Sequence, residues 1–160
     1  RMDLLHPEFV SFINCANKNN LRYLLIGGYA VNFHGYNRNT QDLDVWIAPT
    51  SENKEAFINT MLCMKYAESE VSHLRKEDFT VAFKADVGTV DADIDVMTFV
   101  HPQLDFEKNK KKKEVFLLEE NLPMNFVSYN FLIKTKLKAA RPKDLWDIEQ
   151  LEKLRTNNKS

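Results

Sequence analysis

The spacing of apolar residues alternates between helical and extended periods, and this alternation divides the chain into predicted helices and strands. Apolar side chains at three- and four-residue intervals predict a helix that begins at Pro7 and ends at Asn19-Asn20. A short apolar run over 21–28 ends in two glycines and predicts a buried strand. Carboxylates alternate with apolar residues over 42–48, which predicts a second strand. A short helix or turn is expected between the two strands, at 29–36.

The pattern further along the chain predicts the remaining elements. Helical spacing over 49–66 predicts a helix whose N-cap is Ser51. The stretch 79–99 predicts two strands that are hinged near Val87-Gly88-Thr89. Two short extended pieces and two closing helices follow, at about 115–118, 122–127, 129–140 and 142–155. Because neither a repeat nor a linker interrupts the pattern, we expect one α/β (α+β) domain over residues 1–160, with a mixed sheet flanked by helices and closing helices at about 129–155.

Composition narrows the class of protein. The 160 residues are 44% hydrophobic and 28% charged with a net charge of −1, which argues against a protein-wide basic surface that binds nucleic acid non-specifically. No apolar run approaches the ~20 residues of a membrane span, and no signal-peptide pattern is present. Cys15 and Cys63 lie in apolar, helix-like contexts without metal-ligand spacing. We expect both cysteines to be reduced core residues in a cytoplasmic protein without membrane association.

The glycines and aspartates of the first two strands carry the candidate chemistry. Gly27-Gly28 ends one strand and opens a helical turn, where the missing side chains let phosphates approach backbone N–H groups. Asp42 and Asp44 share one face of the next strand, because the side-chain period of a strand is two. Such carboxylates repel each other unless a cation or basic partners lie nearby, and Mg²⁺ accepts such pairs while keeping waters and phosphates as other ligands. The stretch favours a metal-bound triphosphate. The alternative is an ordinary turn followed by a solvated edge strand.

Three sequence blocks in this order resemble the DNA polymerase-beta-like nucleotidyltransferase superfamily. The blocks are "YLLIGGYAVNFHGYNRNTQDLDVWIAPTSEN", "IDVM" and "LIKTKLKAARPKDLWDIEQL". Within that superfamily they are most similar to the small bacterial nucleotidyltransferases, the minimal enzymes of the abortive-infection and antitoxin-type group. The resemblance spans residues from about 5 to 152. One departure is Ala140, where relatives often have glycine.

The resemblance implies a polymerase-beta-like fold and a transferase reaction. Members bind a nucleoside triphosphate (NTP) such as ATP with two Mg²⁺ ions, or Mn²⁺ in their place, and transfer the nucleotidyl group to an acceptor hydroxyl with release of pyrophosphate. Asp42 and Asp44 would hold both ions, and a third carboxylate would hold the ion that carries the attacking hydroxyl and help to take its proton. Asp91, Asp93 and Asp95 share one strand face. The family's hydrophobic run directly follows its carboxylate, which favours Asp95 over Asp93.

The resemblance also assigns nucleotide binding to four basic or polar positions, namely Arg38, Thr40, Lys136 and Lys143. Each of the basic positions has a structural alternative. Arg38 could form a salt bridge with an acidic group instead of contacting a phosphate. Arg141 and Lys143 could equally pair with Asp144 and Asp147 on a helix surface.

The acceptor stays open at the level of sequence. It could be a protein, a tRNA or a small molecule, and a homo-oligomer or a toxin partner is compatible with the resemblance. The run Lys110–Lys113 predicts either a solvated hairpin or loop, or a patch that follows the phosphates of an RNA acceptor. The alternative function is a catalytically weak nucleotide-binding antitoxin or interaction module. The retained carboxylates argue against it, since a binding module has no need of three costly acidic groups.

Overall fold

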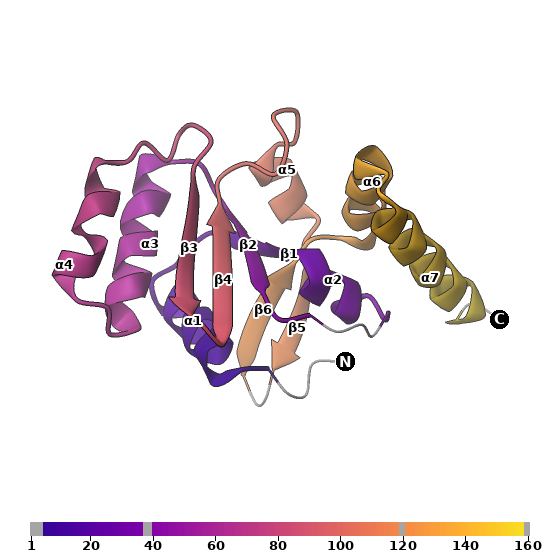
Figure 1. The fold of residues 1–160 in the computed structure, drawn as a ribbon, viewed down its shortest axis with the longest axis horizontal. Coiled ribbons are helices and arrows are strands. Elements are labelled where there is room, and N and C mark those ends of the chain that lie inside the picture. Colours follow the sequence, from indigo (N-terminus) through magenta and orange to yellow (C-terminus); the bar gives the residue numbers. More distant parts are fainter. Residues whose placement is uncertain (1–4, 37–39, 119–120, 159–160) are drawn as a thin grey trace.

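Six strands form one mixed sheet in the computed structural model, which describes residues 5–36, 40–118 and 121–158 (Figure 1). The order across the sheet is β3-β4-β2-β1-β6-β5. The strands are β1 (Tyr23–Ile26), β2 (Leu43–Ile47), β3 (Lys84–Thr89), β4 (Ala92–Met97), β5 (Glu114–Leu118) and β6 (Leu122–Phe126). Strands β1 with β2, β3 with β4 and β5 with β6 pair antiparallel, whereas β2 with β4 and β1 with β6 pair parallel. The observed class is therefore mixed α/β, in agreement with the expected mixed sheet.

Seven α-helices and one 3₁₀ turn accompany the sheet in the described ranges. They are α1 (Pro7–Lys18), α2 (Gly27–Phe33), α3 (Ser51–Cys63), α4 (Glu68–Val71), the 3₁₀ turn η1 (Ser72–Lys76), α5 (Phe106–Lys111), α6 (Tyr129–Ala139) and α7 (Pro142–Asn158). In Figure 1, α3 and α4 lie beside β3, whereas α6 and α7 pack together at the opposite side of the molecule. None of these helices has the length and apolar character that crossing a membrane requires.

The two faces of the sheet are covered differently. Helix α1 packs against α3 and contacts β4 and β6, so this pair covers one face. Trp46 points to the other face, where its ring stacks on Phe131 of α6 and meets the edge of the Phe106 ring of α5. Trp46 is fully buried by these contacts. Helices α5 and α6 cover the Trp46 side chain. The carboxylates of β2, β3 and β4 lie on the same face of the sheet, outside this apolar contact.

Local sequence signals explain most helix starts, with one correction. Pro7 begins α1, as predicted, and Ser128 caps α6 by accepting a hydrogen bond from the backbone N–H of Phe131 (3.1 Å). The predicted cap of α3 was wrong by one residue. Thr50, not Ser51, has the extended backbone of an N-cap and accepts the hydrogen bond from the Asn53 N–H (3.0 Å).

Two further sequence predictions need correction. The β3–β4 hinge lies at Val90-Asp91 instead of 87–89, because Thr89 already pairs with Ala92. Gly88 is therefore a strand residue, with φ +99°. The lysine-rich run does not form a hairpin or loop. Its first part is helix α5, capped by the Asp105 side chain and anchored by the buried Phe106.

The expectation of reduced cysteines was wrong, because Cys15 of α1 and Cys63 of α3 form a disulfide. Their Cα atoms are 5.7 Å apart although 48 residues separate them in sequence. The α1–α3 packing brings them together on one side of the sheet. The reduced state was one ground for expecting a cytoplasmic protein, and that ground is removed, since disulfides are rare in reducing compartments.

We expect the disulfide to contribute about 2–4 kcal/mol to the free energy of unfolding, because it closes a long loop in the unfolded chain. Urea unfolding of the wild type with and without a reductant measures this difference. The Cys63→Ser variant should match the reduced wild type and should not respond to reductant. Two free thiols in the untreated, unfolded wild type would contradict the assignment.

Candidate functional site

The centre of the candidate site is a pair of carboxylates on neighbouring strands. Strands β2 and β4 run parallel, and their register places Asp44 directly beside Asp95. Their side chains lie on the same face and are hydrogen-bonded to each other. Asp42, one residue before β2, is exposed, and its charge acts on both of them. The structure therefore places Asp44 beside Asp95, about fifty residues away in sequence, with Asp42 within electrostatic range of both.

The environment of this pair favours its protonated forms. Burial, together with the charges of Asp95 and Asp42, raises the pKa of Asp44 to about 6, and the charge of Lys143 opposes the shift. Burial also raises the pKa of Asp95, with added repulsion from Asp93 and Asp42. The folded chain thus holds carboxylates close together at a cost in electrostatic energy, which a bound cation would relieve.

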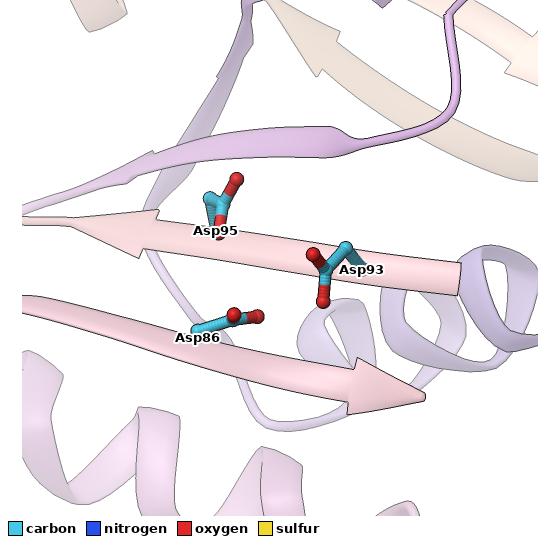
Figure 2. A group of neighbouring side chains, drawn as sticks. All are labelled: Asp86, Asp93 and Asp95. Carbon is cyan, nitrogen blue, oxygen red and sulfur yellow. The ribbon is translucent and has the colours of Figure 1, made fainter. Parts of the chain in front are cut away.

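Two more aspartates extend the acidic group across the β3–β4 hairpin. Asp86 of β3 pairs in register with Asp95, and Asp93 of β4 lies on the same face (Figure 2). Carboxylate oxygens of Asp86, Asp93 and Asp95 lie within 4.8 Å of one another. A hydrogen bond with Asp86, followed by burial and the charge of Asp86, raises the pKa of Asp93. Sequence reasoning missed Asp86, because only the Val90-Asp91 hinge gives the register that places it opposite Asp95.

Gly27 is fitted against Asp44. Its backbone has φ +70°, in the left-handed region that glycine adopts without strain. A Cβ atom added to Gly27 would overlap the carboxylate of Asp44. Gly27 therefore has no side chain because the Asp44 carboxylate occupies that space. The sequence alone does not reveal this contact between Gly27 and Asp44. Gly28 is buried within α2, which begins at Gly27.

An open cleft of about 520 Å³ gives access to the carboxylates. Asp44, Asp86 and Asp95 line it together with Lys84 and neighbouring β3 and β4 residues. The cleft is therefore strongly acidic, with one lysine at its wall. This volume is in the range of small-molecule sites, about 300–1,000 Å³.

The structure describes three of the four basic or polar positions predicted to bind nucleotide, and their surroundings differ. Lys143, exposed at the start of α7, is near enough to Asp44 to lower the pKa of that carboxyl. The Lys136 Nζ instead pairs with Asp147 (2.8 Å) and Asp144 (3.6 Å). The sequence alternative had named Arg141 and Lys143 as the partners of these two aspartates. The Thr40 hydroxyl donates a long hydrogen bond (3.5 Å) to the Asp42 carbonyl. Arg38 lies outside the described residues.

The ion pairs at the start of α7 are structural. Asp144 and Asp147 are almost fully buried, and Arg141 donates to Asp144 from its Nε (2.6 Å). This hydrogen bond holds the pKa of Asp144 below its usual range. Together with Lys136, these charges join α6 to α7. Arg141 therefore forms the structural ion pair that was the alternative to nucleotide binding. Lys143, near Asp44, is the basic position with a direct electrostatic link to the carboxylates.

The donor set fits a hard divalent cation. Carboxylate oxygens are the ligands that Mg²⁺ and Mn²⁺ prefer, and Asp44, Asp86 and Asp95 offer them at one open cleft, with the charge of Asp42 within electrostatic range of Asp44. The raised pKa of Asp44 reflects burial first and repulsion from Asp95 and Asp42 second, and a bound cation would relieve that repulsion. An acidic set of this kind could bind a metal-complexed phosphate ester, whereas it would repel a free one.

We expect the stability of the metal-free protein to depend on Asp44 between pH 4 and pH 6. The folded state binds a proton there that the unfolded state releases, so the free energy of unfolding falls as pH rises through this window. Asp44→Asn should be more stable than the wild type by about 1–2 kcal/mol above pH 6, after allowance for partial exposure, and equal to it below about pH 4. Urea unfolding of both proteins across this range tests the difference. A difference that does not change with pH would contradict it.

Comparison with known proteins identifies no family. No protein-family model matches the chain, and no curated protein matches it significantly. The nucleotidyltransferase resemblance accordingly rests on the sequence motifs, to which the structure adds the arrangement of Asp42, Asp44 and Asp95.

Proposed function

We propose that the protein is a metal-dependent nucleotidyltransferase that moves a nucleoside monophosphate from an NTP to an acceptor hydroxyl. The observation that carries this proposal is the pairing of Asp44 with Asp95 on adjacent parallel strands, with Asp42 within electrostatic reach. The sequence motifs supply the reaction class, and the acidic cleft supplies a place for a metal-complexed triphosphate.

The proposed reaction forms one bond and breaks another at the α-phosphorus. The acceptor oxygen joins this phosphorus, the bond to the bridging oxygen of the β-phosphate breaks, and pyrophosphate leaves. Mg²⁺ or Mn²⁺ ions held by Asp42, Asp44 and Asp95 would neutralise the phosphate charge and make the acceptor hydroxyl more acidic. Asp95 would receive the hydroxyl proton and pass it to solvent, because it would lie beside the ion that holds this hydroxyl.

Other parts of the chain position the triphosphate. Gly27 keeps Asp44 in place by leaving room for its carboxylate, and the adjacent Gly28 backbone opens α2 beside it. Lys143 lies within electrostatic range of Asp44 and would balance phosphate charge, while Lys136 joins α6 to α7, the helix that carries Lys143. Catalysis on this account is positioning and charge neutralisation.

A comparison of two radioactive labels tests the proposed reaction. The protein is incubated with host lysate, Mg²⁺ and either an α-labelled or a γ-labelled NTP. Nucleotidyl transfer predicts that an acceptor is labelled from the α position alone. Labelling from the γ position would indicate phosphoryl transfer and reject the proposal. NTP binding without any labelled product across all four NTPs would favour the catalytically weak binding module.

A further inference from the structure

Strand β3 is one edge of the sheet, and part of its backbone lacks partners. The Phe83 carbonyl accepts the Thr98 N–H (3.0 Å), so the Phe83 backbone faces the β4 side. Because backbone groups alternate along a strand, those of Lys84, Asp86 and Gly88 face away from β4. Among the described residues, none donates to or accepts from these outward groups of Lys84 and Asp86.

Tyr66 marks one end of this free edge. Its hydroxyl accepts the Gly88 N–H (2.8 Å) and donates to the Gly88 carbonyl (3.4 Å). A side chain thus occupies the place where the backbone of a further strand would continue. The free edge is therefore short and consists of the Lys84 and Asp86 backbone, which offers two N–H and two C=O groups.

A cavity of about 320 Å³ runs beside the same edge. It lies between β3 on one side and α4 with η1 on the other. Its apolar wall comes from Met61, Val71, Leu74, Phe83 and Val87. A free strand edge next to an apolar cavity is the arrangement that binds an extended peptide, because the backbone supplies hydrogen bonds and the cavity selects a side chain.

We propose that β3 binds an extended, lysine- or arginine-bearing segment of a partner protein as an additional strand, with one large apolar side chain in this cavity. The charge of the surface favours a basic segment, since Glu70 and Asp86 line the cavity beside Lys84 and His73, and Asp93 lies next to Asp86. A second copy of this chain fits poorly, because it would bring its own α4 and Tyr66 to the same narrow edge.

Docking is tested without nucleotide or metal, so its failure is distinct from failure of the transfer reaction. The probes are short acetylated peptides of lysine and threonine with alanine, leucine or phenylalanine at the centre, titrated into ¹⁵N-labelled protein. We expect shifts of the Lys84 and Asp86 amide signals, and affinity about tenfold higher with leucine than with alanine at the centre. No binding by any of these peptides, or shifts confined to another surface, would overturn the proposal.

Paired variants separate backbone from side-chain effects. Lys84→Pro removes an outward N–H without removing a hydrogen bond to β4, whereas Lys84→Gln removes the same charge and keeps the N–H. Binding should be lost in the first variant and kept in the second, and equal binding by both would overturn the proposal. Backbone N-methylation of the leucine peptide at alternate residues should also abolish binding, with no change in the protein. A dimer in sedimentation that Lys84→Pro dissociates would show that a second copy occupies the edge, which also overturns the proposal.

Discussion

Replacing Asp44 with asparagine abolishes nucleotidyl transfer on this account while the fold stays intact. The substitution keeps the volume of the side chain and removes one negative charge from the Asp44–Asp95 pair. We expect a loss of about 10³-fold or more in kcat, because the cation that neutralises the transferred phosphate loses a central ligand. Steady-state release of pyrophosphate, with circular dichroism as the check on folding, measures the effect.

Neighbouring aspartates provide matched controls for this substitution. Asp95→Asn should lose activity to a similar extent, since Asp95 is the partner of Asp44 across β2 and β4. Asp91→Asn should keep nearly full activity, because Asp91 is an exposed residue of the β3–β4 turn. Equal activity of Asp44→Asn and Asp91→Asn would show that the carboxylate pair is not the reacting centre. Asp93→Asn distinguishes the two candidates for the third carboxylate and should have a smaller effect than Asp95→Asn.

Replacing Gly27 with alanine should destabilise the protein and also inactivate it. The left-handed backbone at φ +70° costs about 1–2 kcal/mol with any Cβ, and the new methyl group overlaps the Asp44 carboxylate. We expect a loss of about 2–4 kcal/mol in the free energy of unfolding and displacement of Asp44 from Asp95. Urea unfolding and pyrophosphate release measure the two effects.

Gly35→Ala separates backbone strain from displacement of the carboxylate. Gly35 also has a positive φ, +113°, but among the described residues a Cβ there would meet only the Leu154 Cδ1 atom, at an ordinary 3.8 Å. This variant should lose stability through strain alone and retain its activity. If Gly27→Ala retained activity as Gly35→Ala does, the contact between Gly27 and Asp44 would have no functional role.

Local patterns in the sequence predicted much of the fold. The period of two predicted the β2 strand and put Asp42 and Asp44 on one face, and apolar runs located β1, β5 and β6. Pro7 and Pro142 marked helix starts correctly. These elements are readable because each depends on neighbours within a few residues, through side-chain spacing, caps or fixed backbone angles.

Features that depend on distant contacts were not readable. The Cys15–Cys63 disulfide joins residues 48 positions apart, and only the packing of α1 on α3 brings them together. Asp86 joins the acidic group because the register of the β3–β4 hairpin pairs it with Asp95. The hinge predicted from the sequence, at 87–89, does not give this register. The α5 helix within the lysine-rich segment depends on Phe106, whose ring is buried against Trp46 of a distant strand.

Ala140 illustrates an intermediate case. The sequence resemblance noted alanine where relatives often have glycine, and the structure shows why glycine would suit the position. Ala140 ends α6 with φ +50°, a left-handed C-cap that glycine adopts without the steric cost of a Cβ. The glycine that relatives often have at this position is thus explained by the left-handed backbone, which only the structure shows.

Anomalous diffraction tests the central claim most directly. Crystals of the protein would be soaked with Mn²⁺ and an NTP analogue that has a methylene group between the α- and β-phosphorus atoms. The account predicts two manganese peaks in contact with the Asp44 carboxylate, at least one of them shared with Asp95, and the α-phosphate beside them. Manganese bound only between Asp86 and Asp93, or a nucleotide bound away from Asp44, would contradict it.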